Sequence, residues 1–84
     1  MTEKLRDTIC EIAKGMGLGI EGIGRVYTGV TQGAAIGGIS TEQLLVACQE
    51  VAANKLLLNN IGGWQKAEWR ESVLVAQILR RCSE

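Results

Sequence analysis

The sequence contains no histidine, no proline and no phenylalanine, and its nine basic residues are balanced by nine acidic ones. Histidine is the commonest general base, the usual activator of a nucleophile and the commonest transition-metal ligand. Its absence excludes Ser-His-Asp and Cys-His catalytic arrangements and zinc sites that use histidine. We therefore expect a protein that is not an enzyme and that has neither a cofactor nor a metal site.

Long hydrophobic runs are also absent. The longest stretch without a charged residue is Val26 to Thr41, sixteen residues rich in glycine and threonine. A membrane-spanning helix needs about 20 mostly apolar residues, so no transmembrane segment is expected. The absence of proline leaves nothing that forbids long helices.

Cysteine is scarce and scattered. Cys10, Cys48 and Cys82 form no C-x-x-C pair, so neither a zinc ribbon nor a thioredoxin-like redox centre is indicated. Each lies within a helical apolar pattern, which favours a small buried side chain over a reactive thiol. The odd count and the lack of an N-terminal signal peptide favour a reducing compartment, and we expect the cytoplasm.

The length of 84 residues allows one domain, residues 1–84, built around one core. Apolar residues recur at helical spacing over residues 3–14, 25–36, 41–58 and 64–82. Ser40 and Gln43 have the spacing of a capping box at the start of the third of these ranges. The pattern predicts an all-α fold, a small bundle of three or four helices with a glycine-rich segment between the first and third helices.

The glycine-rich segment, residues 15–38, holds nine of the eleven glycines. It can form a tightly packed helix or a loop with short ordered pieces, and we favour a helix from about Arg25 to Ile36. Gly29, Gly33 and Gly37 are four residues apart, so on a helix they form a smooth stripe that another helix can approach closely.

The sequence Ile20-Glu21-Gly22-Ile23-Gly24-Arg25-Val26 resembles the hairpin of helix-hairpin-helix modules over about ten residues. In those modules a Gly-hydrophobic-Gly turn between two helices presents amides to a DNA phosphate. The resemblance implies nucleic-acid binding through Gly22, Ile23, Gly24 and Arg25. The alternative is a turn that simply needs glycine, and zero net charge does not favour nucleic acid as a partner.

Trp64 and Trp69 are two of only three aromatic residues. Five residues apart, their side chains point about 140° apart on an ideal helix, so one core cannot easily take both. Tryptophan and arginine are enriched in interface hot spots, and Trp64, Lys66, Trp69 and Arg70 could form one. The alternative is that Trp64 only closes one end of the bundle.

Together these features predict a small non-catalytic module that binds another protein, acting as a regulator, inhibitor or adaptor of a larger complex. We also expect self-association into a homo-oligomer, because the chain is short for its apolar content and has the glycine stripe. The competing hypothesis is nucleic-acid binding through the Gly22-Ile23-Gly24 turn.

Overall fold

The structure is a computed structural model of the whole chain and describes residues 3–63 and 65–82. These residues form five helices: α1 (Glu3–Gly15), α2 (Ile20–Ile36), α3 (Thr41–Ala53), α4 (Lys55–Gly62) and α5 (Ala67–Cys82). The described residues contain no strand, so the predicted all-helical class is confirmed. The described residues contain five helices, where the sequence predicted three or four.

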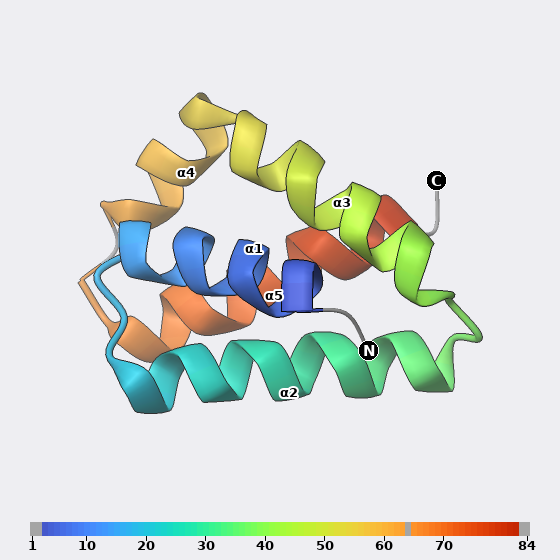
Figure 1. Cartoon of the computed structure of the whole chain (residues 1–84). Helices are drawn as coiled ribbons and strands as arrows, with labels where there is room; N and C mark the ends of the chain where they lie inside the picture. Colours follow the sequence, from blue (N-terminus) through green and yellow to red (C-terminus); the bar gives the residue numbers. More distant parts are fainter. Residues whose placement is uncertain (1–2, 64, 83–84) are drawn as a thin grey trace.

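The helices pack around one core. In Figure 1, α2 runs along one side of the molecule, α1 and α5 lie in the middle, and α3 and α4 cover the opposite side. The main packing partners are α2 with α5 and α1, and α3 with α1 and α5. Helix α5 therefore packs against both α2 and α3.

Buried aliphatic side chains from all five helices fill this core. On α1 the buried residues are Leu5, Ile9, Ile12 and Ala13, which form the apolar stripe of the helix predicted over residues 3–14. The other buried hydrophobic residues are Met16, Leu18, Val26, Val30, Ala34, Leu44, Ala47, Cys48, Val51, Ile61, Leu74 and Ile78. Each element therefore contributes one apolar face, as amphipathic helices in a bundle do.

Local interactions at the helix ends explain several boundaries. The capping box is confirmed: Ser40 Oγ accepts from the Gln43 amide at 3.2 Å, and Gln43 Oε1 accepts from the Ser40 amide at 3.0 Å. The turns before α2 and after it each contain a glycine with positive φ, Gly17 at 75° and Gly38 at 69°. Other residues rarely adopt this conformation.

The second helix is longer than predicted. It begins at Ile20 and not near Arg25, and four glycines of the glycine-rich segment lie inside it. The predicted turn at Gly22-Ile23-Gly24 is therefore wrong, because these residues are helical. Glycines on one face of this helix let two side chains of α5, Val75 and Leu79, pack closely against it. This packing favours a helix, whereas glycine content alone would favour a loop.

The predicted helix over 41–58 is divided in two at Asn54. The backbone of Asn54 has φ −87° and ψ 84°, and its Oδ1 accepts from the Leu57 amide at 3.2 Å, which caps α4. Asparagine competes in this way with the helical backbone. The last helix begins at Ala67 and not at residue 64, and Trp64 lies outside the described residues.

No helix among the described residues is long and apolar enough to cross a membrane.

Candidate protein-binding surface

The first turn of α5 carries a partly exposed tryptophan with a cation over its ring. The side chain of Trp69 is 52% exposed, and Lys66 Nζ lies 5.0 Å from the centroid of its ring. An ammonium at this distance is attracted by the negative face of the indole. The contact holds Lys66 and Trp69 together at one end of the bundle.

Arg70 lies beside this pair. Its Nη1 donates to the Gln65 carbonyl at 3.2 Å, and the amides of both Trp69 and Arg70 donate to the Lys66 carbonyl, at 3.1 and 3.3 Å. These bonds fix the backbone at the start of the helix, and the bond to Gln65 orients the Arg70 side chain. We call Lys66, Trp69 and Arg70 the Trp69 surface; Trp64, the fourth residue of the predicted patch, lies outside the described residues.

A charged pair ties the same end of α5 to α2. Arg25 Nε donates to Glu71 Oε1 at 2.6 Å and Arg25 Nη2 donates to Glu71 Oε2 at 2.9 Å. Glu71 is 7% exposed, whereas the Arg25 side chain is 58% exposed. This two-point geometry is the strongest form of an arginine–carboxylate contact, so it fixes the helix orientation as well as the distance.

The ionisation of the pair follows from this contact. The hydrogen bond from Arg25 lowers the pKa of the Glu71 carboxyl, and burial opposes that effect only in part. The same hydrogen bond raises the pKa of the Arg25 guanidinium. Both groups are therefore held in their charged forms, which suits an ion pair between helices rather than proton transfer.

The four residues proposed for nucleic-acid binding have a different local setting from the one the resemblance implied. Gly22, Ile23, Gly24 and Arg25 lie in the first turns of α2, and Arg25 bonds to Glu71. A Cβ on Gly22 would lie 3.0 Å from Glu71 Oε2, so glycine at this position lets the carboxylate approach.

The glycine stripe lies mainly at the contact between α2 and α5. A Cβ on Gly29 would lie 3.3 Å from Val75 Cγ2, and one on Gly33 would lie 2.5 Å from Leu79 Cδ1. Gly37 is the C-cap residue of α2 and lies against Ile39 instead. Gly29 and Gly33 are therefore used for close packing of α5 within the chain; both are half-buried, and Gly37 is exposed.

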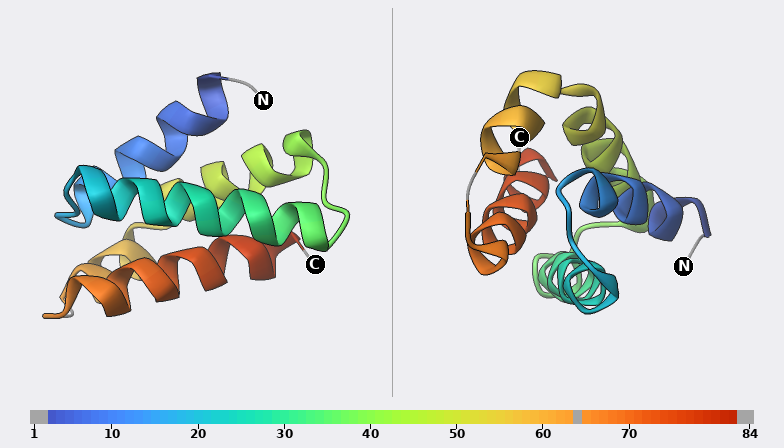
Figure 2. Two further views of the ribbon diagram at one scale, coloured as in Figure 1. Left: turned by 90° about the horizontal axis from the view of Figure 1, so that it is seen from below. Right: turned by 90° about the vertical axis from the view of Figure 1, so that its left-hand side faces the viewer.

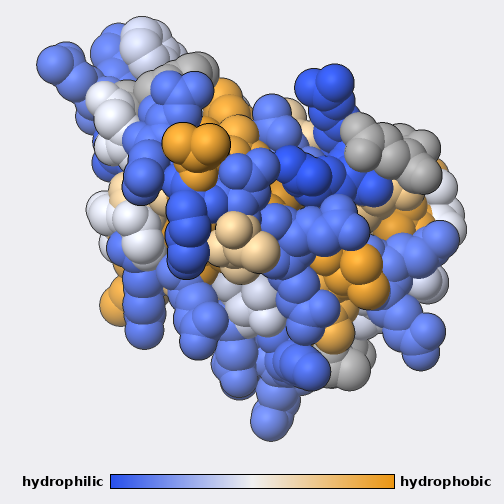
Figure 3. All heavy atoms as spheres, turned by 90° about the horizontal axis from the view of Figure 1, so that it is seen from above, coloured by the Kyte–Doolittle hydropathy of each residue, from blue (hydrophilic) through white to orange (hydrophobic). Residues whose placement is uncertain are grey.

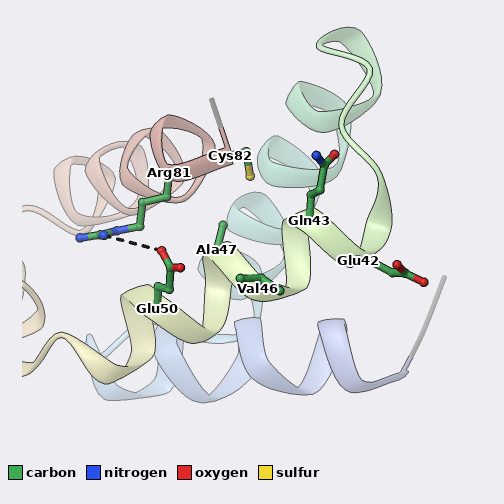
Figure 4. A pocket seen from close by; sticks show the side chains of 7 residues that line it. All are labelled: Glu42, Gln43, Val46, Ala47, Glu50, Arg81 and Cys82. Atoms are coloured by element: carbon green, nitrogen blue, oxygen red, sulfur yellow. Dashed lines mark ion pairs between the residues drawn. The ribbon is translucent and has the colours of Figure 1, made fainter. Parts of the chain in front are cut away.

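A second feature, which sequence reasoning missed, is a hollow of about 320 Å³ between α3 and the end of α5. Figure 4 shows Val46 and Ala47 on α3 below the Cys82 thiol, with Glu50 reaching toward Arg81. The Arg81 Nη1 to Glu50 Oε2 distance is 4.0 Å. These residues are 31 positions apart in sequence, so spacing alone gave no signal for this contact.

The thiols near this hollow are not activated. Burial raises the pKa of Cys48 to about 12. Burial and, to a smaller extent, the charge of Glu50 raise the pKa of Cys82. A thiol is nucleophilic only as its thiolate, so both remain protonated and weakly reactive near neutral pH. Among residues 3–63 and 65–82, no three His, Cys, Asp or Glu side chains lie close enough together to hold a metal ion.

Other large exposed hydrophobic residues are dispersed. Ile20 and Ile36, 90% and 89% exposed, lie at opposite ends of α2, while Leu56 on α4 is 83% exposed and Val46 on α3 is 53% exposed. On the face in Figure 3, hydrophobic patches are small and lie between hydrophilic side chains. The Trp69 surface differs from these positions because it combines an aromatic ring with two cations.

Comparisons of the chain with models of protein families, with curated proteins and with solved structures found no match.

Proposed function

We propose that this chain is a small non-catalytic protein-binding module, a regulator, inhibitor or adaptor, and that its partner docks on the Trp69 surface. The observation that carries the proposal is the indole of Trp69, 52% exposed, with Lys66 over its ring and Arg70 next to it. Tryptophan and arginine are the residues most enriched where a few side chains supply most of the binding energy.

The surroundings of Trp69 support this role because they fix its helix before any partner arrives. The Arg25–Glu71 pair ties the start of α5 to α2, and Leu74 and Ile78 on the same helix are fully buried. A partner that binds a pre-ordered side chain loses less conformational entropy on docking. The surface is thus presented on a rigid element.

The ionisable groups with shifted pKa values support a non-catalytic role. Glu71 is held charged by Arg25, while the thiols of Cys48 and Cys82 are held neutral by burial. Each shift moves the pKa away from neutrality, whereas general acids and bases work best with a pKa near the operating pH. These shifts fit structural roles in helix packing.

The test is recovery of partners by the tagged protein from nuclease-treated lysate of the cells that produce it. Wild type is compared with a Trp69→Ala, Arg70→Ala double variant and with an Ile36→Ala, Arg6→Ala control. The control removes one exposed hydrophobic residue and one exposed cation on other helices.

The double variant is expected to lose a stoichiometric protein that wild type and the control both retain. Removal of a hot-spot side chain costs about 2 kcal/mol or more, which weakens binding roughly thirtyfold. Equal recovery by a folded double variant would contradict the proposal. Recovery that depends on intact nucleic acid would instead favour the competing function.

A further inference from the structure

The exposed surface around Trp69 continues along α5. Residues three and four apart share a face of a helix, which places Trp69, Val73, Ala76 and Arg80 in one row. Trp69, Ala76 and Arg80 are exposed and Val73 is half-buried. We call this row, together with the exposed Lys66 and the half-buried Arg70, the outer face of α5. In the right-hand view of Figure 2, α5 lies at the edge of the bundle, with α4 on one side and α2 on the other.

The charges on this face have one sign. Lys66, Arg70 and Arg80 are basic, and the two described acidic residues of α5 lie elsewhere. Glu71 is buried against Arg25, and the charge of Arg70 also lowers its pKa, while the charge of Glu68 raises the pKa of Arg25. Lys66 and Arg80 are the two exposed cations of the face. The chain as a whole is neutral, so positive charge is concentrated locally on the outer face of α5.

We propose that the outer face of α5 docks an acidic amphipathic segment of a partner protein. This inference rests on the proposed protein-binding function and names the chemistry of the partner. Charge complementarity selects the acidic groups, and the row of Trp69, Val73 and Ala76 selects apolar side chains between them.

The spacing of the cations sets the shape of that segment. Arg70 and Arg80 are ten residues apart, which corresponds to about 15 Å along a helix. Carboxylates that pair with both lie about three helical turns apart on a helical partner, or four to five residues apart on an extended one.

A protein segment fits this face better than a polyanion does. Binding to a phosphate backbone depends on neutralising several successive charges, whereas here three cations are separated by apolar side chains. The half-exposed indole and Val73 have no role in a contact with phosphates alone, and a neutral chain is not attracted to a polyanion at long range.

The experiment is selection of random 16-residue peptides displayed on phage by the immobilised full chain. Wild type is compared with a charge-reversed variant, Lys66→Glu, Arg70→Glu, Arg80→Glu, and with Trp69→Ala. A Lys66→Gln, Arg80→Gln variant repeats the charge test with a smaller perturbation, and circular dichroism confirms that each variant is helical.

Wild type is expected to enrich peptides that combine acidic with apolar residues. The charge-reversed variant should bind these peptides at least about tenfold more weakly and enrich basic peptides instead. Synthetic forms of the enriched peptides should shift amide resonances of α5 in the wild-type NMR spectrum and leave those of α1 unchanged.

The possible failures are distinguishable. Peptides that need Trp69 but carry no net negative charge, or that bind the charge-reversed variant equally well, would overturn this inference and leave the proposed function standing. Acidic peptides indifferent to Trp69→Ala would contradict the proposed site. No enrichment, or binding of labelled single-stranded DNA or anionic vesicles in place of peptides, would overturn the inference.

Discussion

Two glycines of α2 occupy similar backbone positions but have different surroundings, and they allow the packing of α5 to be tested. Both lie inside the helix, and neither has a positive φ. A Cβ on Gly24 would meet nothing within 4 Å, whereas a Cβ on Gly33 would lie 2.5 Å from Leu79 Cδ1 and 3.2 Å from Leu79 Cδ2. The Gly24→Ala variant changes only the helix propensity, whereas Gly33→Ala changes both the propensity and the packing against Leu79. Comparing their free energies of unfolding therefore separates the two effects.

Gly24→Ala is expected to stabilise the protein by about 1 kcal/mol, because alanine is preferred over glycine by this amount inside a helix. For a domain of this size, that raises the melting temperature by about 4–8 °C. Gly33→Ala has the same propensity gain, but the methyl groups of the half-buried Leu79 must rotate away, which costs about 1 kcal/mol, the low end for overpacking. The two variants should therefore differ by about 1 kcal/mol, with Gly33→Ala the less stable.

The assay is urea unfolding followed by circular dichroism at 222 nm, with the slope of the transition compared between variants. Unchanged slopes would show that the two variants differ in stability and not in the unfolded state. If Gly33→Ala stabilised the protein as much as Gly24→Ala, the close approach of α5 to Gly33 would be refuted.

Three further predictions concern single side chains. Ser40→Ala should lower the free energy of unfolding by about 1 kcal/mol, measured by urea unfolding, because it removes the capping box of α3; an unchanged midpoint would contradict the box. The pKa of Glu71 is lowered in the folded state from 4.5, so its contribution to stability is present above pH 4.5 and is lost as the pH falls through the folded value. Melting temperatures from pH 7 to pH 2 should therefore fall more steeply for wild type than for Glu71→Gln, and parallel curves would argue against the Arg25 contact. Burial raises the pKa of Cys48 to about 12, so iodoacetamide at pH 8 should leave this thiol unmodified in the native protein and modify it in urea, as read by peptide mass spectrometry; rapid native modification would show that the core opens there.

The sequence predicted features that depend on neighbouring residues. The stripe of α1 and the capping box of Ser40 were predicted correctly because periodicity and a three-residue spacing determine them. The break at Asn54 was missed because asparagine also occurs within helices. Here the Asn54 side chain caps the next helix. The periodicity of apolar residues does not show whether an asparagine caps a helix or lies within one.

Features that depend on distant residues were beyond sequence reasoning. Gly22 and Gly24 were interpreted as a turn because their pattern resembles a hairpin and glycine suits turns, but their segment is helical and Gly22 lies against Glu71. The resemblance implied a phosphate as a partner of Arg25 in the alternative function, and no sequence signal indicated its contact with Glu71, 46 residues away. The position of Lys66 over Trp69, by contrast, follows from their three-residue spacing at a helix start.

The most direct test of the central claim, that partners dock on the Trp69 surface, is photo-crosslinking in living cells. A photoreactive amino acid replaces Lys66 in one variant and Arg6, on α1, in the other, and covalent products are analysed after nuclease treatment. The account predicts a discrete protein adduct from position 66 and none from position 6. An adduct from position 6 with none from position 66 would contradict it.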